Sequence, residues 1–168
     1  LSADHSGLMV LDPTLKAGTP MRDVLPPPET VLDLEITWNR PDCLSVIGIA
    51  REFAALLKRP LKLPEVSFPE AGEPVGSFAK VVVEDPAKCP RYTARVMTGV
   101  KDGESPEWMR RRLELCGVRA ISLTVDVTNY VMLECGQPLH AFDYRTLAER
   151  TVVVRCAKPG EKIKTLYG

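Results

Sequence analysis

The sequence lacks an excess of charge of either sign, and it lacks a long apolar run. Lysine and arginine together number 22, and aspartate and glutamate also number 22, so the formal net charge at pH 7 is zero. Overall charge therefore does not predict a nucleic-acid partner, although it leaves room for a local basic patch. No apolar run approaches the ~18 residues of a membrane span, so we expect a protein without a membrane-spanning helix.

The cysteine spacings of metal sites and disulfide frameworks are also missing. The five cysteines are irregularly spaced and form no Cys-x-x-Cys pair, so no metal site is predicted. Their odd number and the absence of a secretory segment favour reduced thiols and a cytoplasmic location. Cys116 and Cys135 precede glycines at predicted helix ends, and we interpret both as packing residues.

Common catalytic motifs are absent as well. The sequence contains no P-loop, no Rossmann glycine fingerprint, no His-Glu-x-x-His helix and no Gly-x-Ser-x-Gly elbow. Residues 4–6 read Asp-His-Ser, but adjacent residues do not normally point at one another, so we interpret them as a surface turn. The chain begins without an initiator methionine, and we expect it to be an excised part of a longer protein.

Several short segments bounded by turn residues show the apolar–polar alternation or apolar runs that are typical of strands. The predicted strands cover residues 8–11, 31–37, 79–84, 91–98, 151–155 and 163–166. Residues 26–28 form a stiff Pro-Pro-Pro linker, and residues 65–78 form a second linker rich in Pro, Gly and Glu.

Apolar residues at helical spacing predict a helix over residues 46–57, which Asp42 or Ser45 can cap. Its apolar stripe consists of Val46, Ile49, Ala50, Phe53, Leu56 and Leu57. Arg40, in the loop before this helix, is a weak candidate for a phosphate or partner contact. We favour the alternative, a turn held by an Arg40–Asp42 or an Asn39 hydrogen bond that sets the entry to the helix, because Asn, Pro and Asp are all turn formers.

A second helix is predicted to start at residues 105–107, with Ser105 as its cap and proline at its first position. The side chains predicted to point inward are Trp108, Met109, Leu113 and Cys116. Gly117 ends the helix. The arginines at 110–112 suit a phosphate backbone, but such a run is more often a solvated helix face, which we favour.

The stretch from Asp126 to Phe142 holds the densest set of polar side chains in an apolar frame. These are Asp126, Thr128, Asn129, Glu134, Gln137 and His140. The pattern predicts a helix that Gly136 ends, and Pro138 prevents it from restarting, so a loop can aim His140 at a pocket. For Asp126 and Glu134 we favour helix capping or hydrogen bonds that hold the domain together. The residues alone predict an α+β chain with a cluster of polar side chains near residues 119–140. They do not predict which reaction the chain catalyses.

Three segments of the chain together resemble a known protein family. They are residues 4–11 (Asp-His-Ser-Gly-Leu-Met-Val-Leu), residues 35–52 (Glu-Ile-Thr-Trp-Asn-Arg-Pro-Asp-Cys-Leu-Ser-Val-Ile-Gly-Ile-Ala-Arg-Glu), and residues 125–143 with Val-Asp-Val-Thr-Asn-Tyr-Val-Met-Leu-Glu and Gly-Gln-Pro-Leu-His-Ala-Phe-Asp. In this order and spacing they resemble the β-subunit family of bacterial phenylalanyl-tRNA synthetases. The resemblance covers essentially the whole chain.

The resemblance implies a short mixed strand and helix unit followed by the first half of a larger α+β editing domain. Residues 1–25 would be the tail of an oligonucleotide-binding-type β domain. Residues 26–64 would be a small strand–loop–helix domain, and residues 65–168 the N-terminal part of the editing domain.

In this family, the editing domain hydrolyses tyrosine mistakenly attached to the phenylalanine tRNA. Carried over by motif, His140 and Asn129 would serve the water and the ester end as catalytic residues. Thr128 would line the pocket wall, and Arg119 would lie near the tRNA end or fix the loop, both as substrate-binding residues. The family's glutamate that reads the tyrosyl hydroxyl lies further along, so this chain is expected to hold one wall of the site and not to edit alone.

The resemblance also implies ATP and Mg²⁺ for the whole enzyme, with no cofactor in this part of it. The implied partners are the synthetase α subunit, in an α2β2 heterotetramer, and tRNA(Phe), with no membrane. One alternative is a non-catalytic RNA-binding or subunit-assembly module that uses residues 39–42 and 110–112. Another is a self-standing deacylase acting on free mischarged tRNA.

Overall fold

The computed structural model describes residues 10–25 and 27–164, and the chain divides into two units, residues 1–34 and 35–168. In the first unit, the described residues form turns and one short helix, α1 (Met21–Val24). Residues 10 and 11 of the predicted strand at 8–11 are not in a strand. The rest of that strand and the Asp-His-Ser segment lie outside the described residues.

The second unit contains a small parallel sheet, in which β1 (Lys80–Val83) pairs with β2 (Thr151–Val154). The predicted strands at 79–84 and 151–155 are therefore confirmed. Both contain three consecutive valines, whose branched Cβ atoms favour extended backbone. Parallel strands need a long crossover connection, and two helices lie within this one. The chain is thus a mixture of helices and strands, as the α+β prediction required.

The predicted strands at 31–37 and 91–98 are wrong, because the structure has no strand in either segment. Alternation shows which side chains suit a sheet, but a strand also needs a neighbour to satisfy its backbone hydrogen bonds. Within the described part of the chain, β1 and β2 bond only to each other. Residues 163 and 164 are not in a strand either, and the end of that predicted strand lies outside the described residues.

Helix α2 (Val46–Leu56) packs on a short 3-10 helix, η1 (Pro41–Cys43). The Ser45 hydroxyl caps α2 by accepting a hydrogen bond from the Gly48 N–H at 3.1 Å, as predicted. Most of the apolar stripe of α2 is exposed, with Leu56 at 76%, and only Ile49 and Ala50 are half-buried. At 100° per residue the buried Gly48 lies on the opposite side of the helix from this stripe, so α2 meets η1 through the other face.

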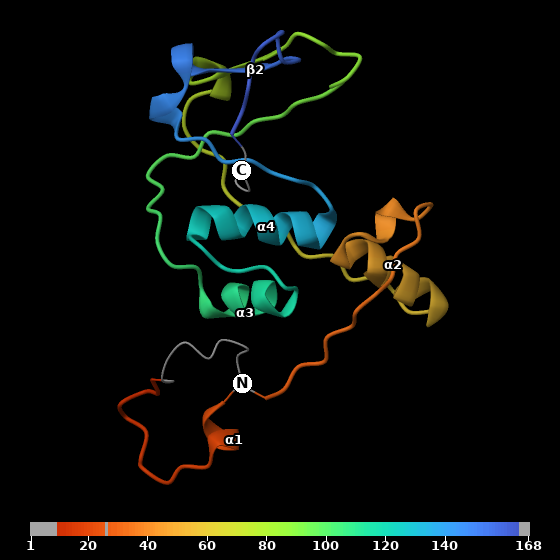
Figure 1. Cartoon of the computed structure of the whole chain (residues 1–168), viewed down its shortest axis with the longest axis vertical. Helices are drawn as coiled ribbons and strands as arrows, with labels where there is room; N and C mark the ends of the chain where they lie inside the picture. Colours follow the sequence, from red (N-terminus) through yellow and green to blue (C-terminus); the bar gives the residue numbers. More distant parts are fainter. Residues whose placement is uncertain (1–9, 26, 165–168) are drawn as a thin grey trace. The chain divides into compact units, whose positions relative to one another are not determined.

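Helices α3 (Glu107–Leu115) and α4 (Leu123–Cys135) pack side by side (Figure 1). Leu113, at 0% exposure, and Met109, at 8%, are the buried residues of α3, and both were predicted to point inward. Trp108 was also predicted to point inward, but it is 52% exposed. Its ring instead meets the edge of Tyr130 on α4, with the ring centroids 5.5 Å apart.

The ends of α3 depart from the prediction in two further ways. Ser105 does not cap α3, because Pro106 occupies the cap position and Ser105 donates its hydroxyl proton to Asp126 instead. Gly117, at φ +77°, ends the helix as predicted and leaves Cys116 on the surface. Cys135 at the end of α4 is exposed too, so interpreting either cysteine as a packing residue was wrong.

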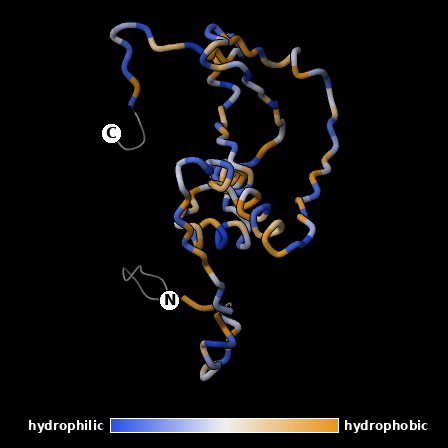
Figure 2. The backbone as a smooth tube through the Cα atoms, turned by 90° about the vertical axis from the view of Figure 1, so that its right-hand side faces the viewer, coloured by the Kyte–Doolittle hydropathy of each residue, from blue (hydrophilic) through white to orange (hydrophobic). Residues whose placement is uncertain are grey.

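Three more 3-10 helices complete the described elements: η2 (Val75–Ser77), η3 (Tyr144–Thr146) and η4 (Ala148–Arg150). The Tyr144 hydroxyl donates to the Phe78 carbonyl at 2.8 Å, which ties η3 to the segment before β1. In the described ranges, no helix combines the length and apolarity of a membrane span. Hydrophobic and hydrophilic residues instead alternate over short distances along the backbone (Figure 2).

Candidate functional site

Helix α4 carries the centre of the predicted site. Gly136, at φ +78°, ends α4 in the left-handed conformation, as predicted. Thr128 and Asn129 lie in the middle of the helix, and both are half-buried. The Thr128 hydroxyl donates to the Val125 carbonyl at 2.6 Å. Its oxygen can therefore still accept a hydrogen bond from a ligand.

His140 lies in the loop that follows α4 and is exposed. Its ring packs at a tilt against Phe142, with the centroids 4.5 Å apart. The loop begins where α4 meets the start of α2, since a Cβ on Gly136 would lie 3.5 Å from the Cβ of Ser45. The imidazole therefore has an apolar neighbour on one side and a route to solvent.

Arg119 lies in the connection between α3 and α4 and is also exposed. A helix of 13 residues is about 20 Å long at 1.5 Å per residue. Arg119 and His140 therefore stand on segments that meet opposite ends of α4, with Thr128 and Asn129 between them. The four predicted residues therefore lie along α4 and the two loops that flank it.

Asp126 is the most deeply buried polar residue described, at 1% exposure. One carboxylate oxygen accepts the Ser105 hydroxyl at 2.6 Å, and the other accepts the backbone N–H of Ile121 at 2.8 Å. This is the structural role that the sequence favoured for Asp126. The same residues line a small open hollow of about 160 Å³ together with Glu104, Arg110 and Ala120.

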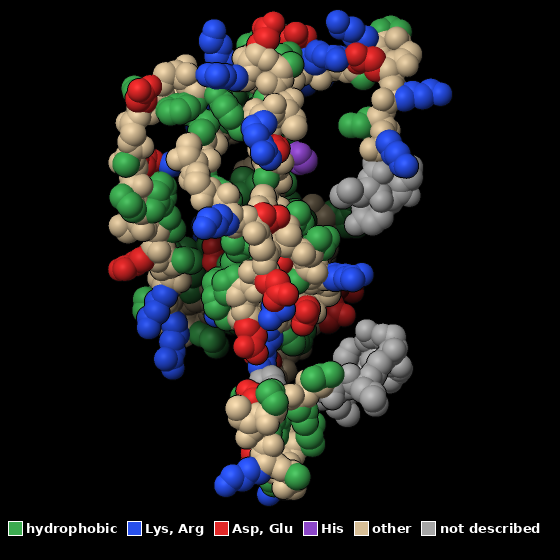
Figure 3. All heavy atoms as spheres, turned by 90° about the vertical axis from the view of Figure 1, so that its left-hand side faces the viewer, with side chains coloured by type: hydrophobic (Ala, Val, Ile, Leu, Met, Phe, Trp, Pro, Cys, Tyr) green, Lys and Arg blue, Asp and Glu red, His purple; other side chains and the backbone are tan. Residues whose placement is uncertain are grey.

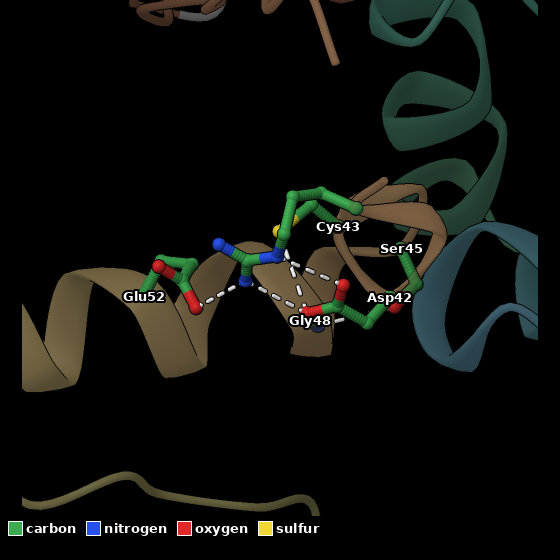
Figure 4. A network of polar contacts seen from close by, with 6 residues as sticks. Asp42, Cys43, Ser45, Gly48 and Glu52 are labelled. Atoms are coloured by element: carbon green, nitrogen blue, oxygen red, sulfur yellow. Dashed lines mark hydrogen bonds and ion pairs between the residues drawn. The ribbon is translucent and has the colours of Figure 1, made fainter. Parts of the chain in front are cut away.

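Arg40 is held by two carboxylates of its own unit. Its guanidinium donates to both oxygens of Asp42, at 3.0 and 2.8 Å, and to Glu52 on α2 (Figure 4). The Arg40 hydrogen bonds lower the pKa of Asp42 to about 2, and the same bonds raise the pKa of Arg40. Burial raises the pKa of the Cys43 thiol beside them. The turn that the sequence favoured is thus present.

Asp42, Cys43 and Glu52 are the one group of three potential metal ligands in the described part of the chain. The Arg40 guanidinium bonds both carboxylates of this group. Mg²⁺ prefers near-octahedral oxygen coordination with several waters. A cation would have to displace Arg40 and accept a thiol neighbour, so this group does not fit the Mg²⁺ implied for the whole enzyme.

The arginines of α3 make contacts within the chain. Arg112 donates to the Tyr130 hydroxyl at 2.6 Å and lies over the Trp108 ring, 5.4 Å from its centroid. Arg110 lies 3.7 Å from a carboxylate oxygen of Glu104. Acidic and basic side chains are mixed over the face shown in Figure 3. These contacts weaken the interpretation of residues 39–42 and 110–112 as a phosphate-binding surface.

Two contacts at this site were not predicted. The Ser105–Asp126 bond spans 21 residues, and the Arg112–Tyr130 bond spans 18. Helical spacing places Trp108 and Arg112 four residues apart on one face of α3, which was a usable signal for their contact. No local pattern identifies Tyr130 as their partner, because the pairing depends on how α3 and α4 pack.

The chain is similar in sequence to one protein-family model and to several curated proteins. Residues 88–168, which include α3, α4 and β2, match the family model of the B3/4 domain. Curated relatives named phenylalanine–tRNA ligase beta subunit are 52% identical in Anaeromyxobacter dehalogenans, over 168 residues, and 51% identical in Geobacter sulfurreducens, also over 168 residues. A relative of the same name in Syntrophus aciditrophicus is 52% identical over 166 residues.

The class of protein is given by residues 88–168, which are similar to the B3/4 domain. About half of this chain's residues, counted along essentially its whole length, are identical in each of these relatives, so the chain belongs to the family of the phenylalanine–tRNA ligase β subunit. The resemblance predicted from the sequence is confirmed. The chain spans 21% of the length of each of these relatives, about a fifth.

Proposed function

We propose that the chain is part of a phenylalanine–tRNA ligase β subunit and carries one wall of a site that hydrolyses tyrosyl-tRNA(Phe). The observation that supports this most is the placement of four motif residues along α4 and its flanking loops. Thr128 and Asn129 lie on the helix, and Arg119 and His140 lie beside its two ends. The named relatives support the ligase assignment, and the wall assignment rests on the motif.

The reaction needs a positioned water, donors for the carbonyl oxygen and contacts to the terminal adenosine. Water attacks the ester carbonyl, the bond to the ribose oxygen breaks, and that oxygen takes up a proton while tyrosine leaves. His140 is suited to guide the water because a ring nitrogen of a neutral imidazole can accept a hydrogen bond from it. The Asn129 amide can donate to the ester carbonyl.

Thr128 and Arg119 would act in binding. Because the Thr128 hydroxyl donates its hydrogen bond to the Val125 carbonyl, its oxygen is left as an acceptor on the pocket wall. Arg119 is exposed at the other end of α4, where a guanidinium suits a phosphate or ribose of the tRNA end. The length of α4 would separate tRNA contact from ester chemistry.

A second site of this kind has a physical rationale. An apolar pocket shaped for phenylalanine rejects an isostere with one added hydroxyl by only ~100-fold. A polar group that rewards the tyrosyl hydroxyl in a separate site can remove the error, because phenylalanine would leave that group unpaired. We propose that this group lies elsewhere in the β subunit, so that the 168-residue chain does not edit by itself.

The remaining features are proposals of the same kind. Residues 1–25 would end an oligonucleotide-binding-type domain, residues 26–64 would form a small domain, and residues 65–168 would begin the editing domain. The α subunit, in an α2β2 assembly, would aminoacylate tRNA(Phe) in the cytoplasm with ATP and Mg²⁺. None of the described residues is assigned to ATP.

The test is deacylation of tyrosyl-tRNA(Phe) by the assembled enzyme with His140→Ala in its β subunit. If His140 guides the water, kcat for deacylation falls by at least ~100-fold. Arg145→Ala is the matched control, since Arg145 is exposed in η3 and pairs with Asp143. Unchanged deacylation by His140→Ala would remove His140 from the site, and an unreactive wild-type enzyme would refute the proposed function.

A further inference from the structure

Asp126 joins three segments of the chain through one buried carboxylate. Its own backbone lies in the first turn of α4. One oxygen accepts the hydroxyl of Ser105, just before α3, and the other accepts the N–H of Ile121, in the connection between α3 and α4. A buried carboxylate with a bond to each oxygen fixes the relative position of its partners, because breaking either bond leaves a buried polar group unsatisfied.

The bond to Ile121 has a consequence for the site. Ile121 is two residues after Arg119, on the same short connection. Asp126 is two residues before Thr128 and three before Asn129, on the same rigid helix. The 2.8 Å bond therefore links the segment that carries Arg119 to the helix that carries the other two residues.

We propose that Asp126 is a positioning residue that sets Arg119 relative to Thr128 and Asn129. This inference rests on the proposed function. The two oxygens of Asp126 are engaged by Ser105 and Ile121, so Asp126 acts through the α3–α4 connection. Displacing a reactive group by about 1 Å can lower a rate by ~100-fold. Loss of the link lets the tRNA end bind while its ester is misplaced against α4.

The two bonds of Asp126 separate a site effect from a packing effect. Ser105→Ala removes the bond that ties α4 to the start of α3 and leaves the bond to Ile121. Asp126→Ala removes both bonds. Asp126→Asn preserves the shape, because its amide oxygen can accept from Ile121 and its NH₂ can donate to the Ser105 oxygen. The three variants thus distinguish the Ile121 link, the Ser105 bond and the carboxylate charge.

The experiment measures kcat and KM for tyrosyl-tRNA(Phe) deacylation by the assembled enzyme, with phenylalanine aminoacylation by the same preparation as a check of its integrity. We expect Asp126→Ala to lower kcat by ~10- to 100-fold with KM changed by less than about threefold. Ser105→Ala and Asp126→Asn are expected to stay within about threefold of wild type in kcat. His140→Ala is the reference for the proposed function.

Three other outcomes would contradict the proposed role of Asp126. If Ser105→Ala matches Asp126→Ala, the effect arises from α3 packing and the positioning role is refuted. If Asp126→Asn is as poor as Asp126→Ala, the charge acts rather than the two bonds. If His140→Ala abolishes deacylation while Asp126→Ala does not affect it, the inference fails and the proposed function stands.

A second readout does not depend on activity. Amide hydrogen exchange over residues 118–122 of the assembled enzyme is expected to rise in Asp126→Ala and to stay near wild type in Ser105→Ala. Unchanged exchange in Asp126→Ala would refute the link, even in an enzyme that shows no deacylation.

Discussion

The α2 region, which comprises η1 and α2 (residues 41–56), and the α3–α4 pair hold their helices in place by opposite means. At α2, contact depends on a missing side chain, since a Cβ on Gly48 would lie 1.7 Å from the Asp42 carbonyl oxygen. In the α3–α4 pair, contact depends on side chains that fill the interface, with Leu113 fully buried and Asp126 bonded on both oxygens. Backbone contact fixes the first region, and side-chain packing fixes the second.

The charged groups of the two regions differ in the same way. Arg40, Asp42 and Glu52 form their network at the surface, where ion pairs are weak because water and salt screen them. Asp126 is shielded from water, so each of its hydrogen bonds matters more. We therefore expect added atoms to destabilise the packing of α2 on η1, and removed atoms to destabilise the packing of α3 on α4.

The largest effect is expected for Leu113→Ala. Leu113 is 0% exposed, and removing a fully buried leucine side chain costs about 3 kcal/mol of unfolding free energy. Leu56→Ala is the matched control, because Leu56 is 76% exposed on α2 and should change the stability of the 168-residue chain by less than about 0.5 kcal/mol. Urea unfolding of the chain measures both. Equal costs for the two variants would break the comparison.

A somewhat smaller and more local effect is expected for Gly48→Ala. The new Cβ meets backbone atoms of Asp42, so α2 must move away from η1. Overpacking of this kind costs about 2–3 kcal/mol, although alanine is otherwise the better helix former. Faster amide hydrogen exchange across residues 41–56 should reveal it, with little change in α3.

Gly76→Ala is the control for Gly48→Ala. Gly76 lies in η2, and a Cβ there would meet no atom within 4 Å. Exchange over residues 41–56 should therefore match wild type in this variant. If Gly48→Ala also leaves that exchange unchanged, close backbone contact does not hold α2.

The sequence predicted these regions unequally, for a physical reason. Helix ends depend on local chemistry, so Ser45, Gly117 and Gly136 were identified correctly as a cap and two helix ends. Gly48 was not identified as a contact point, because nothing near it in the chain shows that η1 folds back onto α2. Strand formation depends on a distant partner, so the valine runs were recognised while the alternating segments at 31–37 and 91–98 were wrongly predicted as strands.

The candidate site shows the same limit. Motif resemblance selected Arg119, Thr128, Asn129 and His140, and the structure arranges them along α4. Ser105 was given the role of a helix cap, which its position before proline suggested, but Asp126 competes for its hydroxyl across 21 residues. A side chain with two possible partners cannot be assigned from its neighbours in sequence when one partner is brought to it by packing.

The smallest effect concerns the exposed ion network of the α2 region. The pKa of Asp42 is about 2 in the folded chain, against an ordinary value of 3.8, because Arg40 donates hydrogen bonds to its carboxylate. A lowered folded-state pKa means that this network stabilises the fold above pH 3.8, and that its contribution is lost as the pH falls through about 2. In Arg40→Ala, the pKa of Asp42 should move up toward 3.8.

Carboxyl carbon NMR of Asp42 between pH 2 and pH 6 measures this shift directly. Asp143, whose pKa is about 2 because of hydrogen bonds from Arg145, is the internal control and should titrate alike in wild type and Arg40→Ala. The unfolding midpoint at pH 6 should change less in Arg40→Ala than in Gly48→Ala, because the Arg40 network is exposed. A larger change in Arg40→Ala would mean that ion pairing, rather than close backbone contact, holds α2 on η1.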